Sequence, residues 1–551
     1  MEKIWLNQYQ QGVPAEINPN EYRSLVELYV ESCNKFEQNP AFANMGTEIS
    51  YGELLKLSQM LAVFLQTIGL KHGDRVAIMM PNTLQYPVVL FAILLAGYVV
   101  VNTNPLYTSE ELIFQLNDSN TKAIFVLANF AHTLEKALPN TPQLKHIIIT
   151  ELGDLFPFFK RFLVNNIAKY IKKMVPAFHI PQAISFNHAL TIGAREKFKP
   201  VELNHEDIAF FQYTGGTTGI AKAAMLSHGN MIANILQVTA WIVALDIKER
   251  DVIITALPLY HIFSLTANCL TFISSGAKNI LITNPREMTH FIKEIKNVQF
   301  TAITGVNTLF NTLLHHPKFS SIDFSKVKLA LAGGMPLQKK VSIEWHEKTH
   351  TRILEAYGLT ETSPAVAINP MYLEEYNGSI GLPIPSTDVS IRDNNGKELP
   401  LGEIGELCVN GPQVMRSYWN QETETELAFW PDGYLRTGDN AKIDDKGYIY
   451  LIDRKKDMIL VSGFNVYPNE VEQVIGSMPS VLEVGVIGVD NGESGEKVKA
   501  CIVKSDPALT AEEIINHTRK HLTAYKIPKI IEFYTELPKS NVGKILRREL
   551  R

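Results

Sequence analysis

The sequence has few of the features that mark secreted, zinc-binding or membrane-spanning proteins. Its 551 residues include only four cysteines, Cys33, Cys269, Cys408 and Cys501, which are far apart and form no Cys-x-x-Cys pair. We therefore expect neither a disulfide framework nor a zinc site. We expect the protein to occupy a reducing compartment. The most apolar run, residues 87–101, is shorter than the roughly 20 residues that cross a bilayer. The first residues are too polar for a signal peptide, so a cytoplasmic protein is expected.

The sequence also has no sustained run of basic residues. The formal net charge is −5 and charged residues make up 20% of the chain, so nothing indicates nucleic acid as a partner. A hydrophobic content of 46% is ordinary for a globular protein. The chain is too long for a single core, and three or four structural units are expected.

Short β-branched runs alternate with helical periodicity through the first 380 residues. This alternation predicts mostly parallel sheets covered by helices. The predicted strands are residues 75–79, 123–126, 146–150, 252–256, 279–283, 302–304 and 329–332.

The pattern changes at about residue 381, where short strands separated by turns predict a small antiparallel, barrel-like β unit over residues 381–452. A charged cluster, residues 453–457, separates this unit from a new α+β pattern. We therefore expect an α/β fold with a large amino-terminal region (1–453), a connection (454–456) and a smaller α+β carboxy-terminal domain (457–551).

The segment between Tyr213 and Lys222 is rich in small and hydroxylated residues. It has almost no apolar side chain to bury, but its glycines let backbone N–H groups approach a polyanion, and its lysine adds a positive charge. A phosphate site is one interpretation, and a flexible turn is the other. A Walker-type loop is disfavoured because Gly-Lys-Ser/Thr is absent. The candidate phosphate ligands are Tyr213, Thr214, Gly215, Gly216, Thr217, Thr218, Gly219 and Lys222.

This segment resembles the phosphate loop of the adenylate-forming superfamily, which includes acyl-CoA synthetases, luciferases and peptide-synthetase adenylation domains. Further motifs of that superfamily follow in the expected order, at residues 257–261, 332–336, 357–362, 434–439, 453–457, 461–470 and 538–544. Residues 301–310 and 461–470 are most similar to bacterial long-chain fatty acid–CoA ligases. The chain departs from the common pattern at Ala223, where glycine is usual, and at Tyr434 and Arg436, where Trp and His are common.

The resemblance implies a two-step reaction. A fatty acid carboxylate attacks the α-phosphate of ATP to give an acyl-adenylate and pyrophosphate, and the thiol of CoA then displaces AMP. Mg²⁺ is the implied cofactor, with ATP and CoA as co-substrates. The family implies a role in fatty acid uptake and degradation, but lipid remodelling is equally compatible with these residues.

The resemblance also assigns residues to the nucleotide. Glu361 is the candidate magnesium carboxylate and Thr360 the α-phosphate contact. Asp439 would accept the ribose hydroxyls, Arg454 would assist at the ribose or phosphate, and Lys544 would reach the α-phosphate and the acyl carboxylate. The adenine would lie against Gly333, Gly334, Tyr357 and Gly358. Without the family, Glu361 would be interpreted as a helix-start carboxylate and Asp439 as an Asx-turn residue. Arg454 would form a linker salt bridge, and Lys544 would be a solvated lysine.

Other positions match the hinge, the CoA channel and the acyl pocket of the family. Lys456 matches the hinge about which the small domain rotates between an adenylating and a thiolating pose. The CoA channel would include Val461, Ser462 and Gly463, and the acyl pocket would include His261, Thr304, Gly305 and Val306.

The segment Leu155–Ile180 combines basic and large apolar residues without an acidic one. Most basic residues fall on one arc of a helical wheel and most large apolar ones on the opposite arc, with Phe158 and Phe162 on the basic side. Such a segment suits an anionic membrane surface, and packing of its apolar face on its own domain is the alternative. Peripheral association with the inner face of the membrane is therefore a prediction.

Three alternatives stay open at this stage. The enzyme could activate a medium-chain or aryl acid, or it could transfer the acyl group to a carrier-protein thiol. A non-catalytic lipid-binding protein on the same fold would have lost active-site residues, whereas Thr360, Glu361, Asp439, Arg454 and Lys544 are all present. The oligomeric state and the range of acyl chain lengths do not follow from the sequence.

Overall fold

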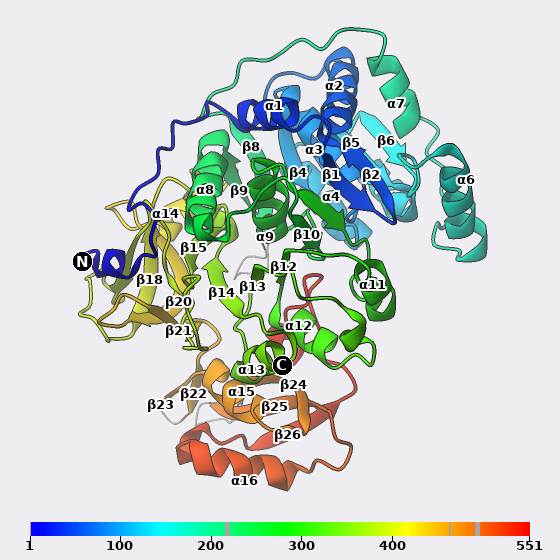
Figure 1. Cartoon of the computed structure of the whole chain (residues 1–551). Helices are drawn as coiled ribbons and strands as arrows, with labels where there is room; N and C mark the ends of the chain where they lie inside the picture. Colours follow the sequence, from blue (N-terminus) through cyan, green and yellow to red (C-terminus); the bar gives the residue numbers. More distant parts are fainter. Residues whose placement is uncertain (1, 215–220, 462–463, 491–495) are drawn as a thin grey trace.

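Two large sheets form most of the amino-terminal part of the protein (Figure 1). The computed structural model describes residues 2–214, 221–461, 464–490 and 496–551. The eight-stranded sheet has the order β19 (Ser417–Tyr418), β9 (Lys222–Ser227), β8 (Ile208–Thr214), β4 (Val99–Asn102), β3 (Arg75–Met79), β5 (Ala123–Leu127), β6 (His146–Thr150) and β7 (Ile184–Ser185). Its strands from β8 to β7 are parallel, whereas β9 pairs antiparallel with both of its neighbours, β8 and β19.

The strand interiors alternate between two apolar clusters because successive side chains point to opposite faces of a sheet. Val76 and Ile78 pack on one face, and Ala77 and Met79 on the other. The first face is covered by α1 (Leu25–Lys35), α2 (Tyr51–Thr67), α3 (Gln85–Leu95) and α7 (Phe186–Gly193), and the second by α4 (Ser109–Asp118) and α5 (Ala131–Ala137).

The nine-stranded sheet is built in the same way. Its order is β16 (Leu382–Pro383), β15 (Ala365–Ile368), β14 (Ile353–Gly358), β13 (Leu329–Gly333), β12 (Ala302–Gly305), β10 (Val252–Thr255), β11 (Lys278–Leu281), β1 (Pro40–Asn44) and β2 (Thr47–Ser50). The strands from β14 to β1 are parallel. Helix α8 (His228–Trp241) leads from β9 into β10, and the helices that follow the strands of this sheet are α9 (Ile262–Ser264), η6 (Leu265–Leu270), α10 (Thr271–Ile273), α11 (Met288–Ile295), α12 (Asn307–Leu314) and α13 (Lys339–Thr349). Two helix-covered, mostly parallel sheets are therefore confirmed.

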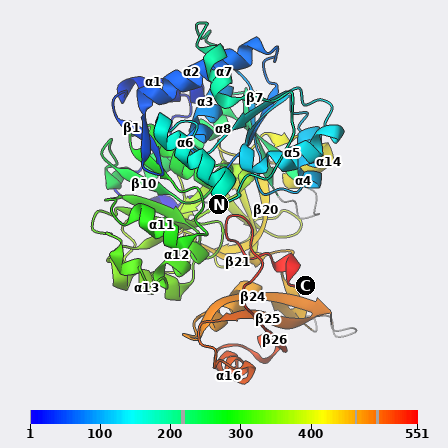
Figure 2. The same cartoon turned by 90° about the vertical axis from the view of Figure 1, so that its right-hand side faces the viewer.

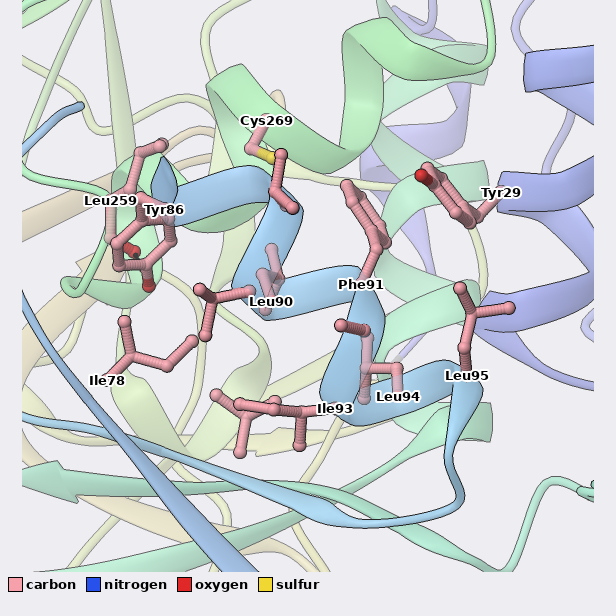
Figure 3. Packing of buried hydrophobic residues seen from close by; sticks show 14 of the residues in the cluster. Tyr29, Ile78, Tyr86, Leu90, Phe91, Ile93, Leu94, Leu95, Leu259 and Cys269 are labelled. Carbon is pink, nitrogen blue, oxygen red and sulfur yellow. Dashed lines mark hydrogen bonds between the residues drawn. The ribbon is translucent and has the colours of Figure 1, made fainter. Parts of the chain in front are cut away.

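Helix α3 covers the first part of the most apolar run of the chain and is buried on every side. Phe91 stacks on Tyr29 with a ring separation of 3.8 Å, and residues from both large sheets share the cluster (Figure 3). Just before the helix, the Asn82 side-chain amide donates to the carbonyls of Thr255 and Leu257. This contact fixes the segment that leads from β10 toward His261.

The predicted barrel-like unit is an open sheet. Its four antiparallel strands are β17 (Asp388–Arg392), β18 (Gly405–Asn410), β20 (Leu435–Ile443) and β21 (Ile449–Arg454), with β17 and β21 at the edges. The antiparallel pattern is confirmed, but the prediction of a barrel is wrong, since β17 and β21 do not pair among the described residues. Helix α14 (Glu422–Ala428) connects this sheet back to β19.

A carboxy-terminal unit, residues 459–550, has its own small cores. It contains the hairpin β22 (Ile459–Val461) and β23 (Phe464–Val466), the sheet β24 (Val481–Asp490), β25 (Glu496–Lys504) and β26 (Ile530–Tyr534), and helices α15 (Pro468–Gly476) and α16 (Ala511–His521). The unit lies below the large sheets, and its red terminal segment extends up to them (Figures 1 and 2).

Helix α6 (Phe158–Asn166) and the following π-helical turn η4 (Ile167–Ile171) lie at the periphery (Figure 1). Phe156 and Ala168 are buried, whereas Phe158, Phe159, Phe162 and Ile171 are exposed. The segment therefore packs on its own domain in part and leaves its other large apolar side chains exposed. No helix in the described part of the chain is long and apolar enough to cross a membrane.

We predict that Phe91→Ala lowers the free energy of unfolding by about 3–5 kcal/mol, because it leaves a cavity beside the stacked Tyr29 ring. The matched control is Phe159→Ala, whose side chain is 85% exposed and whose loss should change stability by less than about 0.5 kcal/mol. Thermal unfolding of both variants checks this. Equal unfolding temperatures would contradict the burial of α3.

Candidate active site

The carboxyl ends of four neighbouring parallel strands meet at one edge of the nine-stranded sheet. The strands β10, β12, β13 and β14 lie side by side in the sheet. Because parallel strands all end on the same edge, the loops that follow them converge there, which is where ligands bind in open α/β sheets. The sequence-predicted residues at these strand ends are His261, Thr304, Gly305, Val306, Gly333, Gly334, Tyr357, Gly358, Thr360 and Glu361.

Two glycines at this edge are required by the backbone. A Cβ at Gly358 would lie 2.0 Å from the carbonyl oxygen of Pro364, a distance that no side chain tolerates. Gly334 has φ +78°, in the left-handed region that favours glycine. The chain therefore turns sharply after β13 and passes close to its neighbour after β14.

A chain of contacts through Tyr357, Asp439 and Arg454 joins the nine-stranded sheet to the four-stranded sheet. The Tyr357 hydroxyl donates to Oδ2 of Asp439 at 2.6 Å, and Nε of Arg454 lies 3.6 Å from Oδ1 of the same carboxylate. Asp439 and Arg454 are directly paired between β20 and β21. Burial, with the nearby Asp439 charge, raises the pKa of Tyr357 well above its usual range, so the hydroxyl stays a donor and fixes the carboxylate.

Glu361 lies in the short 3₁₀ turn η8 (Thr360–Thr362), which begins at Thr360. The hydroxyl of Tyr418 donates to Oε1 of Glu361 at 2.6 Å. The ammonium of Lys222 lies 5.3 Å from the centre of the Tyr418 ring and is paired with Glu424 of α14. The structure thus joins the lysine of the candidate phosphate loop to the candidate magnesium carboxylate through Tyr418.

Part of the candidate phosphate loop, Gly215–Gly219, lies outside the described residues, as do Ser462 and Gly463 of the candidate CoA channel. The flanks are described: Thr214 and Lys222 are paired at the ends of β8 and β9. Tyr213 donates its hydroxyl to Asp118 at 2.5 Å. Its side chain is thus directed to α4.

Lys544 comes from the carboxy-terminal unit, on a hairpin (residues 539–545) that docks against the amino-terminal part. The Thr308 hydroxyl, on α12, donates to the carbonyl of Gly543 at 3.0 Å, and Arg286 donates to Asn541 at 3.2 Å. Gly543 has φ +85°, and a Cβ there would lie 2.7 Å from the Thr308 hydroxyl. The tip of the hairpin therefore fits against α12 only with glycine at this position.

Lys544 lies near other charged groups, which change its pKa. Burial and the Arg454 cation lower the pKa of Lys544 to about 8, while Asp439 acts in the opposite direction. Burial and the Lys544 cation lower the pKa of His261 to about 4. Lys544 therefore lies within electrostatic range of His261, Arg454 and Asp439, although it is far from all of them in sequence.

The candidate acyl-pocket residues occupy different environments. The fully buried Thr304 side chain donates to Asn268 at 2.8 Å, so its hydroxyl points into the core. A Cβ at Gly305 would meet the Phe310 ring at 2.9 Å. Val306 is buried next to Gly334 and Gly543, and the backbone of Phe263 donates to the His261 ring.

The connection between the four-stranded sheet and the carboxy-terminal unit runs from Arg454, at the end of β21, through Lys456 to β22. Burial and the Arg454 cation lower the pKa of Lys456. Val461 ends β22 and pairs with Phe464.

Within the described ranges, no cluster of three or more His, Cys, Asp or Glu side chains could hold a metal ion on its own. Glu361, which accepts only the Tyr418 hydroxyl among the side-chain contacts described above, is the candidate metal carboxylate. This donor still fits Mg²⁺, which is usually held by one or two carboxylates together with substrate phosphates and water.

Comparison with known proteins places the chain in a family. Residues 29–419 match the AMP-binding enzyme family, and residues 470–544 match the AMP-binding enzyme C-terminal domain. The chain belongs to this family. A protein named long-chain-fatty-acid–CoA ligase from Escherichia coli O6:H1 is 53% identical over 100% of this chain and 98% of that relative.

Two further relatives agree with this assignment. The protein of the same name from Haemophilus influenzae is 49% identical, with 100% of this chain and 98% of that relative covered. The crystal structure of ATP-bound MatB from Rhodopseudomonas palustris is 28% identical, with a TM-score of 0.79 over 96% of this AMP-binding enzyme and 98% of that chain.

Sequence patterns do not identify several polar residues of this site. Glu406, buried in β18, is paired with Arg436 and Lys455 and accepts from the backbone N–H of Gly438. It thereby fixes the turn before Asp439. Tyr418 and Glu424 were likewise missed. Only Glu406 carries a sequence signal, as a lone carboxylate inside a strand of apolar residues.

We predict that amine labelling of Lys544 titrates near pH 8 rather than near the usual lysine value of about 10.4. Arg454→Gln should raise this midpoint, because it removes a cation that disfavours the charged ammonium. Competitive labelling with an amine-selective reagent, followed by mass spectrometry, measures both. A midpoint above pH 10 in the unmodified protein would contradict the described surroundings of Lys544.

Proposed function

We propose that this AMP-binding enzyme is a long-chain fatty acid–CoA ligase. The observation that carries the proposal is the convergence of Lys222, Glu361, Tyr357–Asp439–Arg454 and the incoming Lys544 at one sheet edge. Its support is the full-length similarity to proteins of that name. The proposed reaction is acid–thiol ligation, with ATP and CoA as co-substrates. Its proposed role is fatty acid uptake and degradation.

In the first step, a carboxylate oxygen of the fatty acid attacks the α-phosphorus of ATP. The bond between the α-phosphorus and the bridging oxygen breaks, and pyrophosphate leaves. In the second step, the sulfur of CoA attacks the acyl carbonyl, loses its proton to solvent, and AMP leaves with the electron pair of the acyl–oxygen bond. Catalysis of the first step depends mainly on positioning and on cations near the phosphates.

Each cation and acceptor of the site has a part in this proposal. Lys222 and the loop before it would hold the β- and γ-phosphates. Lys544 would contact the α-phosphate and the acyl carboxylate, with Thr360 and Arg454 nearby. Asp439, whose orientation is set by the Tyr357 hydroxyl, would accept the ribose hydroxyls.

The nucleotide also requires backbone and metal contacts. Adenine would lie along Gly333, Gly334 and the Tyr357–Gly358 backbone. Bound Mg²⁺ would neutralise phosphate charge, and Glu361 is the residue of this chain that would hold it. Its carboxylate would then exchange the hydroxyl of Tyr418 for the ion.

The protein would change pose between the two steps. We assign residues 1–453 to the large domain, 454–456 to the hinge with Lys456, and 457–551 to the small domain. Rotation about the hinge would withdraw Lys544 and bring Val461, Ser462 and Gly463 to the CoA channel. His261, Gly305, Val306 and the backbone of Thr304 would line the acyl pocket.

Peripheral binding to the cytoplasmic face of an anionic membrane is the second part of the proposal. Phe159 in α6 is 85% exposed and Ile171 at the end of η4 is 74% exposed. Lys169 lies in η4 and Lys172 directly follows it. Exposed aromatic and aliphatic side chains next to lysines suit the boundary between headgroups and acyl chains. The occupant we propose is a lipid surface, because the substrate itself partitions there.

The reaction is tested by AMP and pyrophosphate release with palmitate, ATP and Mg²⁺, with and without CoA. We expect CoA-dependent turnover with palmitate to exceed that with octanoate and benzoate. Adenylation that CoA fails to discharge would instead indicate a carrier-protein thiol as acceptor. No adenylation of any of these acids would contradict the proposed function.

The membrane proposal predicts that Lys169→Gln with Lys172→Gln weakens binding to phosphatidylglycerol vesicles by roughly 10- to 30-fold, at about 1 kcal/mol per lysine. The matched control, Lys397→Gln with Lys446→Gln, also removes two exposed cations and should leave binding unchanged. Vesicle sedimentation measures both. Equal binding of the two double variants would contradict the role of this surface.

A further inference from the structure

Arg547 makes the densest set of charged contacts in the described part of the carboxy-terminal unit. Its Nε and Nη2 atoms donate to the two oxygens of Glu472 at 3.0 and 2.8 Å, and Nη2 also donates to Asn469 at 2.5 Å. Nη1 donates to Asp453 at 3.0 Å and to Asp457 at 3.4 Å. All five N–H groups of the guanidinium therefore have acceptors, in a fork geometry that a lysine cannot reproduce.

These acceptors belong to two parts of the molecule. Glu472 and Asn469 lie on α15, inside the carboxy-terminal unit. Asp453 lies in β21, in the sheet that carries Asp439, and its carboxyl group is almost completely buried. The contact between Arg547 and Asp453 thus bridges residues on either side of the connection at 454–456.

Asp453 is also a meeting point for backbone donors. Its Oδ1 accepts from the N–H of Arg454 and its Oδ2 from the N–H of Asn469, both at 2.7 Å. Burial raises the pKa of Asp453, and Arg547 is the strongest influence in the opposite direction. The guanidinium therefore keeps this buried carboxyl group ionised and paired.

The position of Arg547 in the chain connects this cluster to the active site. It follows Lys544 by three residues, after the hairpin that docks on Thr308. Arg454, the neighbour of Asp453, reaches Asp439 and lies near Lys544. A bond from Arg547 to Asp453 therefore sets where Lys544 lies relative to the strand that presents Arg454.

We propose that Arg547 is a positioning residue that holds Lys544 in the adenylating pose through its bond to Asp453. The inference rests on the proposed function and adds a specific contact to it. Rotation about residues 454–456 separates Arg547 from Asp453, whereas the contacts with Glu472 and Asn469 move with the small unit. The Arg547–Asp453 pair is thus formed in one pose and broken in the other.

The two half-reactions test this assignment. Asp453→Asn keeps the side-chain shape and removes the charge that Arg547 binds across the connection. We expect adenylation, measured as pyrophosphate release, to fall about 10- to 100-fold, the effect of one charge-assisted hydrogen bond. Thiolation of supplied palmitoyl-adenylate should change less than about threefold. Arg547→Gln should show the same division, with partial rescue in Arg547→Lys.

Arg548→Gln is the matched control. Its side chain is 72% exposed and paired with Glu549 at 3.9 Å, so both half-reactions should match those of the unmodified protein. Equal loss of both half-reactions in Asp453→Asn, accompanied by a lower unfolding temperature, would reduce Arg547 to a structural role and overturn the inference. Unchanged adenylation in Asp453→Asn and Arg547→Gln would overturn it as well.

A distance measurement separates failure of this inference from failure of the proposed function. Spin labels at Ile343→Cys and Lys520→Cys, both exposed, report the pose of the small unit without any substrate, and the four native cysteines are buried. We expect one dominant distance in the parent protein and a broadened or shifted distribution in Asp453→Asn. Identical distributions would overturn the inference, whereas absent adenylation in the parent protein would overturn only the proposed function.

Discussion

Parallel strands end on the same edge of a sheet, and this constraint decides where the loops after β10, β12, β13 and β14 lie. His261, Gly305, Gly334 and Glu361 lie at or after the carboxyl ends of β10, β12, β13 and β14, along one edge of the nine-stranded sheet. The helices between these strands can vary without moving that edge, because only the strand ends fix it. The buried helix α3 and the Asn82 side chain hold the eight-stranded sheet against the nine-stranded sheet near the end of β10. The phosphate-loop strands β8 and β9 belong to that eight-stranded sheet.

Lys544 does not follow from this constraint, since it comes from the carboxy-terminal unit. Its place depends on a few polar contacts: Thr308 with Gly543, Arg286 with Asn541, and Arg547 with Asp453. Contacts of this kind are weaker and more easily exchanged than an apolar interface, and relative motion of two units is the usual consequence. A site that is complete in only one arrangement can carry out two different reactions in sequence.

Local patterns were enough to predict most strands, because β-branched runs and turn residues are local signals. The predicted strands at residues 75–79 and 146–150 coincide with β3 and β6. The barrel was wrong because turn spacing predicts antiparallel pairing but not closure, which depends on whether the edge strands meet. The contacts made by Tyr418, Glu424, Glu406 and Arg547 could not be predicted. Their roles come from partners 57, 202, 30 and 94 residues away, and no local pattern encodes such distances.

We infer that Lys544, supplied by the carboxy-terminal unit, completes the site for the first step only. The most direct measurement compares the two half-reactions in Lys544→Ala: pyrophosphate release from palmitate and ATP, and transfer of supplied palmitoyl-adenylate to CoA. We expect pyrophosphate release to fall roughly 100-fold or more, as for loss of a group that stabilises transition-state charge, and transfer to CoA to be nearly unchanged. Equal loss of both half-reactions would contradict this inference.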